Sequence, residues 1–392
     1  MVNHAGSQEA LLHWLALHLV PGLGTTLASR LIRRLGSPQG IFHASVSELE
    51  SCGLRAGVAQ SIVSGVAFEE AATELEKIQA VGAEVITLQD ERYPDLLKEI
   101  YDPPILLYVR GRTELLRSYK MAVVGSRRPS PYGTAVAAKL GGELAQAGLV
   151  ITSGMARGVD TAAHQGALRV GGDTIAVLGC GVDVVYPAEN RKLAEEIATR
   201  GLLMSESPMG TAAFPQNFPI RNRIISGMSL GVMVVEAAQY SGSLITARLA
   251  GEQGREVLAV PGAIVNKLSW GPNLLIKQGA TLVQDWKDVV EAMPLGVRQA
   301  IIDSQREVLA ALAVSASGET SEASGASVRV ALPAVQRRLL ELVQVDVGVH
   351  IDTLIGQLEE VSSASEIIGA LCELELAGYL RQLPGKNYVR VW

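Results

Sequence analysis

The chain has 392 residues, of which 48% are hydrophobic, and its formal net charge is −6. A chain of this length exceeds one ordinary domain, and we expect two or three. The acidic balance excludes binding of nucleic acid by bulk attraction, so any such binding must come from a local basic patch. The apolar stretch Leu11–Val20 is too short to cross a membrane, and no other run reaches the required length of about 18 residues.

Three cysteines, Cys52, Cys180 and Cys372, lie far apart in the sequence and form no Cys-x-x-Cys pair. This usage favours a reducing compartment and argues against a zinc site. We therefore expect a cytoplasmic protein that uses no metal and no cofactor and has no membrane partner.

Residues 1–67 are predicted to form a helical domain. Two helical patterns, Leu11–Leu19 and Thr25–Leu35, are joined by Pro21-Gly22-Leu23-Gly24. This order is typical of a helix-hairpin-helix unit, whose glycine turn can set backbone N–H groups against a DNA phosphate. A plain tight turn between helices explains the same residues, because the only basic residues near it are Arg30, Arg33 and Arg34.

Residues 68–294 are predicted to form an α/β domain with a doubly wound, mostly parallel sheet. Short apolar runs alternate with helical patterns, and this alternation is typical of βαβ units. The predicted strands are Met121–Val124, Leu149–Thr152, Thr174–Leu178, Leu202–Ser205, Gly231–Val235, Glu256–Val260 and Thr281–Val283. The predicted helices between them are Tyr132–Ala147, Asp160–Leu168, Asn190–Arg200, Ser243–Gly254 and Asn273–Gln278. A helix at Phe68–Val81 and strands at Glu84–Thr87 and Leu106–Val109 lead into this sheet and can add edge strands to it.

Two glycine-rich turns follow the first two strands of the parallel sheet. The first reads Gly125-Ser126-Arg127, and the second begins Ser153-Gly154 and is followed by Arg157. Glycine lets the backbone approach a ligand, the start of the next helix offers unpaired N–H groups, and arginine adds charge. Neither turn matches the P-loop or the G-x-G-x-x-G dinucleotide motif. The pattern therefore indicates binding of a nucleotide or of a nucleic-acid backbone.

The C-terminal part is predicted to hold a linker, 295–330, and a winged-helix domain, 331–392. Residues 304–327 are rich in Ser, Ala and Gly. Helical patterns follow at Leu332–Val343, Ile351–Leu358 and Ser365–Ala377, and then a hairpin of Tyr379–Leu383 and Tyr388–Val391. The domain has five Lys and Arg against eight Asp and Glu. Contact with a partner or docking within the chain fits this acidic module better than duplex binding, although Lys386 at the wing tip can touch DNA.

The core closely resembles the DNA-processing protein A family (DprA, also called Smf). The matching motifs, in chain order, are Val124–Arg127, Ser153–His164, Ala176–Asp183, Tyr186-Pro187 with Asn190, Phe218–Gly227, Ser241–Ala247 and Val260–Gly262. The resemblance covers about residues 100–290. It implies an extended Rossmann-like core that dimerises and binds single-stranded DNA. It also implies a protein without enzyme activity that protects incoming DNA in natural transformation and helps to load the RecA recombinase.

The resemblance assigns Arg127 as a DNA-contacting arginine, together with Gly125 and Ser126; the alternative is a surface arginine paired with a carboxylate. Arg221 and Arg223 flank Asn222 near the expected start of a helix. Residues two apart do not share a helix face. We therefore expect one of these arginines to face a ligand and the other to make a structural ion pair.

Further candidates follow the third and fifth strands of the parallel sheet. Tyr186 can stack on a base while Asn190, Arg191 and Lys192 reach phosphates or base edges. The family often has a basic residue at the position where this chain has Ala188. The alternative is that Tyr186-Pro187 is an ordinary packing corner. Ser241, Gly242 and Ser243 form either an anion site at a helix start or a plain serine cap. A ligand contact and a purely structural role therefore both stay open, at Tyr186 as well as at Ser241–Ser243.

Asp160 and His164 are four residues apart, a spacing that can mimic a metal or acid–base pair. We expect instead that Asp160 caps its helix and that His164 is a hydrogen-bonded core residue. Asn273, Ile276 and Leu282 fall where the family's core pairs with its partner subunit, and packing within the chain is the alternative.

A competing function is that of a nucleoside-monophosphate phosphoribohydrolase, a Rossmann-like enzyme that cleaves glycosidic bonds. Glu236, at the end of the strand Gly231–Val235, is the one residue that could stabilise the developing cation. The Pro-Gly-Gly and Gly-Thr turns expected around such a glutamate are absent. A third possibility is an adaptor with a vestigial ligand site.

Overall fold

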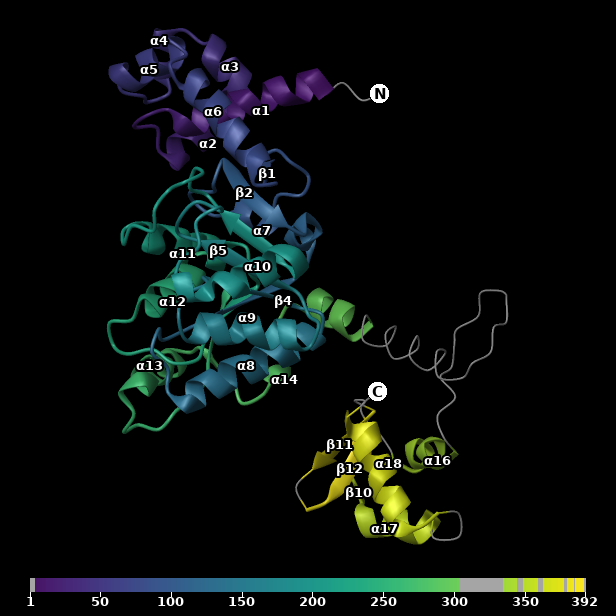
Figure 1. Cartoon of the computed structure of the whole chain (residues 1–392). Helices are drawn as coiled ribbons and strands as arrows, with labels where there is room; N and C mark the ends of the chain where they lie inside the picture. The colour runs from purple at the N-terminus through teal and green to yellow at the C-terminus, as the bar shows by residue number, and fades with distance from the viewer. Residues whose placement is uncertain are drawn as a thin grey trace, which may run out of the picture. The chain divides into compact units, whose positions relative to one another are not determined.

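The computed structural model describes residues 4–303, 334–343, 348–358, 362–376, 379–383 and 385–390. Its contacts divide the chain into two compact units, Met1–Gln305 and Arg306–Trp392 (Figure 1). The first unit contains the helical N-terminal segment and the large sheet, and the second contains the winged helix. The expected linker from residue 304 onward lies outside the described residues.

The N-terminal segment is helical, as the sequence predicts. Its helices are α1 (His4–Leu19), α2 (Thr25–Leu35), α3 (Pro38–His43), α4 (Val46–Ser51), α5 (Ala56–Val63) and α6 (Ala67–Ala80). α4 begins with a capping box between Ser45 and Glu48, and α2 ends at Gly36, whose φ of 84° suits glycine. The buried residues of these helices form one apolar cluster with Ile105, Leu106 and Tyr108 of the sheet edge. Helices and sheet therefore share a core.

A nine-stranded sheet forms the centre of the first unit. The strands are β1 (Glu84–Thr87), β2 (Leu106–Gly111), β3 (Lys120–Val124), β4 (Val150–Ser153), β5 (Thr174–Leu178), β6 (Leu202–Ser205), β7 (Gly231–Val234), β8 (Glu256–Ala259) and β9 (Thr281–Leu282). Their order is β1-β2-β6-β5-β4-β3-β7-β8-β9. β3 to β9 pair in parallel, and β2 joins β6 antiparallel. The predicted mostly parallel sheet, with β1 and β2 added at one edge, is confirmed.

Helices cover both faces of the sheet, because successive side chains of each strand point to opposite sides. On β3, Met121 and Val123 pack with α8 (Pro131–Gln146) and α9 (Val159–Arg169). Ala122 and Val124 pack with α11 (Asn217–Gly227) and α12 (Gly242–Glu252) on the other face. Other helices of this unit are α7 (Asp95–Lys98), α10 (Arg191–Arg200), α13 (Trp270–Lys277) and α14 (Trp286–Glu291), with short 3-10 turns η1 (Thr113–Arg117), η2 (Ala188–Asn190) and η3 (Lys267–Ser269).

Two parts of this unit differ from the sequence prediction. α11 begins at Asn217, so Arg221 and Arg223 lie in its middle and not at its start. Residues 295–303, which we expected in the linker, are helical and bury Val297 and Ile301 in the core under α8 and α9.

The second unit has the winged-helix elements that the sequence predicts. They are α16 (Ala334–Leu342), β10 (Val349–His350), α17 (Ile351–Leu358), α18 (Ala364–Leu376), β11 (Leu380–Leu383) and β12 (Asn387–Arg390). The short strand β10 pairs with β12 and was not expected. Leu339, Leu354, Leu371 and Tyr388 are among the residues of its own apolar core. Across the described residues of both units, no helix is both long enough and apolar enough to span a membrane.

Candidate functional site

A cavity of the first unit lies where the strand order of the sheet reverses. β3 has β4 on one side and β7 on the other. From this position the strand order continues through β4, β5 and β6 toward one edge of the sheet, and through β7, β8 and β9 toward the other edge. Open α/β sheets bind ligands at this switch point, beyond the carboxyl ends of the strands. A cavity of about 870 Å³ lies there, between the end of β3, α11 and the start of α12. Its position is that of a ligand-binding crevice.

Half of the predicted DNA-contacting residues line this cavity. They are Gly125, Ser126 and Arg127 after β3, Arg221 and Asn222 on α11, and Ser241, Gly242 and Ser243 at the start of α12. Residues separated by more than one hundred positions therefore meet at one place. The cavity also includes Phe218, Tyr240, Lys267 and Trp270 in its wall, and none of these four was expected there from the sequence. The motif Phe218-Pro219 and the position of Tyr240 before a Ser-Gly-Ser turn were the available signals.

Arg127 is exposed at the mouth of the cavity. Among the described residues, no carboxylate lies within 4.0 Å of its guanidinium. Its Cζ lies 5.3 Å from the centre of the Phe218 ring, a cation–π distance that orients the side chain. The Phe218 ring in turn lies 5.4 Å from that of Tyr186, which is 41% exposed. Arg127 therefore lies over one aromatic ring, and that ring contacts a second one from a distant part of the chain.

Arg221 occupies the floor of the cavity and is only 6% exposed. Its Nη1 donates to the carbonyl oxygen of Gly154 at 2.9 Å and to that of Val177. Burial lowers the pKa of Arg221 to about 10, against the attraction of the Asp160 carboxylate. A Cβ at Gly154 would lie 2.6 Å from Arg221 Nη2, so glycine is needed for this close packing. Arg221 is therefore a buried charge held in place by backbone oxygens.

Asp160 does not cap its helix, and this expectation is wrong. The N-cap of α9 is Gly158, and the Asp160 carboxylate accepts the backbone N–H groups of Gly154 and Ala156. Burial raises the pKa of Asp160, and Arg221 opposes this shift. The N–H groups that we expected to be free for a phosphate in this turn already have an acceptor.

His164 is a core residue, as expected. It is fully buried and its Nδ1 lies 2.6 Å from the Thr174 hydroxyl. Burial lowers the pKa of His164 to about 3, so the imidazole is neutral. Within the described ranges, no group of three or more His, Cys, Asp or Glu residues could hold a metal ion.

The start of α8 is also occupied by a carboxylate. Glu236 is 1% exposed and accepts hydrogen bonds from the Ser130 backbone N–H at 2.8 Å and from the Ser130 hydroxyl at 2.6 Å. A negative side chain is favourable at a helix N-terminus. The expectation that this helix start offers unpaired N–H groups to a ligand is therefore wrong at Ser130. These hydrogen bonds attach the Glu236 carboxylate to the start of α8, and Glu236 does not line the cavity.

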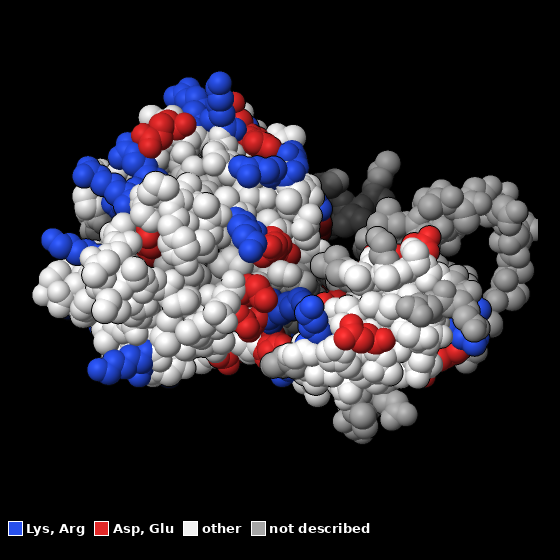
Figure 2. All heavy atoms as spheres, turned by 90° about the horizontal axis from the view of Figure 1, so that it is seen from below, with Lys and Arg blue, Asp and Glu red and all other residues white. Residues whose placement is uncertain are grey.

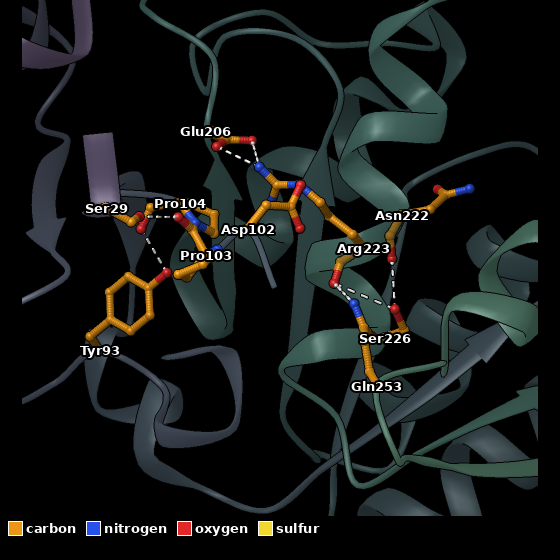
Figure 3. Close-up of polar contacts among 10 residues, drawn as sticks. All are labelled: Ser29, Tyr93, Asp102, Pro103, Pro104, Glu206, Asn222, Arg223, Ser226 and Gln253. Carbon is orange, nitrogen blue, oxygen red and sulfur yellow. Dashed lines mark hydrogen bonds and ion pairs between the residues drawn. The ribbon is translucent and has the colours of Figure 1, made fainter. Parts of the chain in front are cut away.

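Arg223 does not line the cavity, and its guanidinium lies between the carboxylates of Glu206 and Asp102 (Figure 3). Its Nη2 donates to both carboxylate oxygens of Glu206, at 2.7 and 2.8 Å. Its Nε lies 2.9 Å from Asp102 Oδ2, an ion pair whose N–H is not directed at the oxygen. The side chain of Arg223 is 8% exposed, so it contributes structure and is not available to a ligand at this site.

The other predicted residues lie outside the cavity wall. The Ser153 hydroxyl donates to the Val123 carbonyl oxygen, and the buried Asn190 amide donates to the Met155 carbonyl oxygen and the Thr161 hydroxyl. Both are structural contacts. Arg157 is paired with Glu189 at 2.6 Å. Arg191 and Lys192 are exposed at the start of α10 and remain open to a ligand.

Ser241 caps its helix, as one alternative predicts, and the anion-site alternative stays a prediction. Its hydroxyl caps α12 by accepting the Ser243 backbone N–H at 3.4 Å, and the same residues line the cavity. At the far edge of the sheet, the Asn273 amide bonds both the N–H and the carbonyl oxygen of Gly262 within the chain. Ile276 is half-buried, and Leu282 on the edge strand β9 is 41% exposed.

The fold and the cavity together define a Rossmann-like protein with a ligand crevice at the switch point and a separate winged-helix unit. The sequence model described as DNA recombination-mediator protein A matches residues 84–294, and that of the DprA winged helix domain matches residues 324–386. The chain therefore belongs to the DprA/Smf family, which places it among proteins of DNA processing and recombination.

Individual relatives agree with this assignment. The chain is 41% identical to Protein Smf of Escherichia coli over 309 residues, which are 78% of this chain and 77% of that protein. It is 48% identical to DNA processing protein DprA of Streptococcus pneumoniae over 204 residues, 52% of this chain and 72% of that protein. The X-ray structure of the Streptococcus pneumoniae DprA superposes with a TM-score of 0.66 and 36% identity, and covers 72% of this chain and 98% of that one.

Proposed function

We propose that this protein binds single-stranded DNA at the switch-point cavity and acts as a recombination mediator. The observation that carries the proposal is Arg127: an exposed guanidinium without a carboxylate partner among the described residues, over the ring of Phe218, which in turn contacts the ring of Tyr186. Single-strand binders combine backbone-tracking cations with aromatic rings on which bases stack. Lys267 and the exposed Tyr240 extend the same combination along the cavity wall.

The charge distribution supports a local site. Net charge is −6, and on the face that Figure 2 shows, Lys and Arg side chains stand singly or in small groups, with Asp and Glu beside some of them. The net charge of the protein therefore does not attract DNA over long distances. Binding should depend on a few phosphate contacts, weaken with salt and show little sequence preference.

The test is fluorescence anisotropy of a labelled oligothymidylate titrated with wild type and with Arg127→Ala, at low and moderate salt. We expect Arg127→Ala to lower affinity about 10- to 100-fold, because a charge-assisted hydrogen bond contributes about 1.5–3 kcal/mol. The salt slope, which is the decrease of the logarithm of the binding constant with the logarithm of salt concentration, should become smaller by about 0.7. This is the value expected when one phosphate of a single strand is no longer neutralised. Arg248→Ala is the matched control, since Arg248 is exposed on α12 and is paired with Glu252 at 3.6 Å. Equal reductions in both variants would contradict the assignment of Arg127.

Family membership supports three finer proposals. The protein helps to load RecA onto single strands, protects incoming DNA during natural transformation, and forms a homodimer through the sheet edge that carries β9, with Asn273, Ile276 and Leu282 as candidates. RecA filament growth on strands coated with single-strand-binding protein tests the first, and nuclease protection of bound strands tests the second. Sedimentation of Leu282→Glu tests the third, and an unchanged dimer would remove Leu282 from the interface.

No catalytic role is proposed. Glu236, the one candidate for phosphoribohydrolase chemistry, uses both oxygens to hold the start of α8. Incubation with nucleoside monophosphates should release no free base. The cytoplasmic location expected from the scattered cysteines stays a prediction.

A further inference from the structure

A second cavity lies between the N-terminal helices and the edge of the sheet. Its volume is about 510 Å³, and we call it the α2 groove. The residues that give it its chemistry are Thr26, Arg30 and Arg33 from α2 and Lys98, Glu99 and Tyr101 from α7 and the loop after it. Neither the family comparisons nor the switch-point site assigns it a role.

One face of α2 supplies the positive charge of the groove. Thr26, Arg30 and Arg33 are spaced by four and three residues, so they lie along the same side of the helix. Both arginines are exposed, and no carboxylate of the described residues lies within 4.0 Å of either guanidinium. Arginine makes strong charge-assisted hydrogen bonds to carboxylate and phosphate groups, so two such guanidiniums on one wall of a cavity can bind an anion together.

The opposite wall carries one acidic and one more basic side chain. Glu99 is held by Arg255, at 3.4 Å, so its charge is already compensated. Lys98 lies 3.6 Å from Asp95, an exposed pair that contributes little. The groove is therefore positive in balance, unlike the protein as a whole.

Tyr101 adds an aromatic side chain, which is carried by a loop that is held in place. Its side chain is 83% exposed, yet the next three residues of its loop are tied down (Figure 3). Asp102 pairs with Arg223, the Pro103 carbonyl oxygen accepts from the buried Ser29 hydroxyl of α2 at 3.3 Å, and the Pro104 carbonyl oxygen accepts from Tyr93 at 2.8 Å. The ring is thus presented at the groove by a loop with little freedom to move.

The same interactions connect the groove with the switch-point cavity. Asn222 of α11 lines that cavity, and its neighbour Arg223 reaches Asp102, the residue after Tyr101. The two cavities therefore lie on either side of one ion-paired connection between α11 and the loop 101–104.

We propose that the α2 groove is a second contact for the same DNA single strand, with phosphates at Arg30 and Arg33 and a base stacked on Tyr101. This inference rests on the proposed function, because it takes the ligand of the switch-point cavity and extends its path. For a strand long enough to reach both cavities, binding at the second becomes intramolecular, which raises the overall affinity.

The test compares oligothymidylates of increasing length, starting at about 4 nucleotides and passing about 16, the span of site sizes known for single-strand binders. Wild type, the double variant Arg30→Ala with Arg33→Ala, and Tyr101→Ala are titrated by anisotropy at two salt concentrations. The control is Arg34→Ala with Arg55→Ala, which removes the same charge from exposed positions of the same helical segment outside the groove. Urea unfolding of each variant checks that the fold is intact.

For wild type we expect affinity to rise again once strands are long enough to reach the groove. In the double variant this second rise should disappear, with affinity for long strands lower by about 10-fold or more, a salt slope lower by about 1.4, and no change on the shortest strands. Tyr101→Ala should weaken binding about 5-fold or more on long strands only, because the stacked base then has no ring to stack on.

Three results would overturn the proposal, and they separate it from the proposed function. If the groove variants bind strands of every length with the affinity of wild type while Arg127→Ala binds them weakly, the groove is not a DNA contact, and the proposed site at the switch point is retained. If the groove variants lose affinity equally on the shortest strands, the groove belongs to the first site. If wild type binds no strand, both proposals fail.

Discussion

Removal of the Arg223 charge should destabilise the first unit and identify this arginine as a structural residue. Arg223→Met keeps most of the aliphatic length and removes the guanidinium. It takes away two charge-assisted hydrogen bonds to Glu206 and the ion pair to Asp102. Glu206, whose side chain is 15% exposed, is then left without its buried partner.

The expected destabilisation follows from that burial. Removing one partner of a buried ion pair costs about 3–5 kcal/mol, because the remaining charge is left unpaired. Asp102 adds little to this figure, since its side chain is 34% exposed and can turn to water. Burial already raises the pKa of Glu206, against the effect of Arg223, so removal of the arginine favours the protonated carboxyl further.

The assay is urea unfolding followed by circular dichroism, with DNA binding measured at a temperature where the variant is folded. The free energy of unfolding should fall by about 3–5 kcal/mol, and the double variant with Glu206→Gln should recover part of it, because the two changes share one interaction. The exposed pair Arg248–Glu252 provides the control, where Arg248→Ala should change stability by about 0.5 kcal/mol or less. A decrease below about 1 kcal/mol, together with weaker DNA binding by the folded variant, would refute the reasoning and make Arg223 a ligand contact.

Three further predictions concern the buried polar groups. Gly154→Ala should destabilise by about 1–3 kcal/mol in urea unfolding, because its Cβ would lie 2.6 Å from Arg221 Nη2; unchanged stability would contradict this packing. His164 is neutral in the folded protein down to about pH 3, whereas in the unfolded chain it is protonated below about pH 6.5. The free energy of unfolding should therefore fall by about 1.4 kcal/mol for each pH unit between these two values, and His164→Gln should remove that part of the pH dependence. Glu236→Gln should cost about 0.5–2 kcal/mol through Ser130 at the start of α8, and any base release by wild type that this variant abolishes would restore the enzyme hypothesis.

Much of the fold follows from local sequence. Strands such as Met121–Val124 are short apolar runs that end at glycine, and helices such as α8 begin at a serine cap, so chain order alone predicts the βαβ units. The turn Gly125-Ser126-Arg127 is found at the switch point for the same reason, since the ends of parallel strands meet at one edge of the sheet.

The role of each arginine was decided by tertiary structure. Arg127, Arg221 and Arg223 are alike in the sequence, yet the first is exposed, the second is buried against backbone oxygens and the third is paired with two carboxylates. Hydrogen bonds and ion pairs depend on groups that are distant in the chain. The two-residue spacing of Arg221 and Arg223 indicated only that the two side chains differ in role, and not which groups each of them would contact.

The same limit explains Glu236, Phe218 and the α2 groove. Glu236 reaches Ser130 across 106 positions, and the ring of Phe218 meets Tyr186 only because α11 packs over the end of β5. Periodicity and turn residues determined which segments become strands and helices, because those preferences act within a few residues. Which side chains share a cavity, and which carboxylates occupy the helix starts, was determined by long-range packing alone.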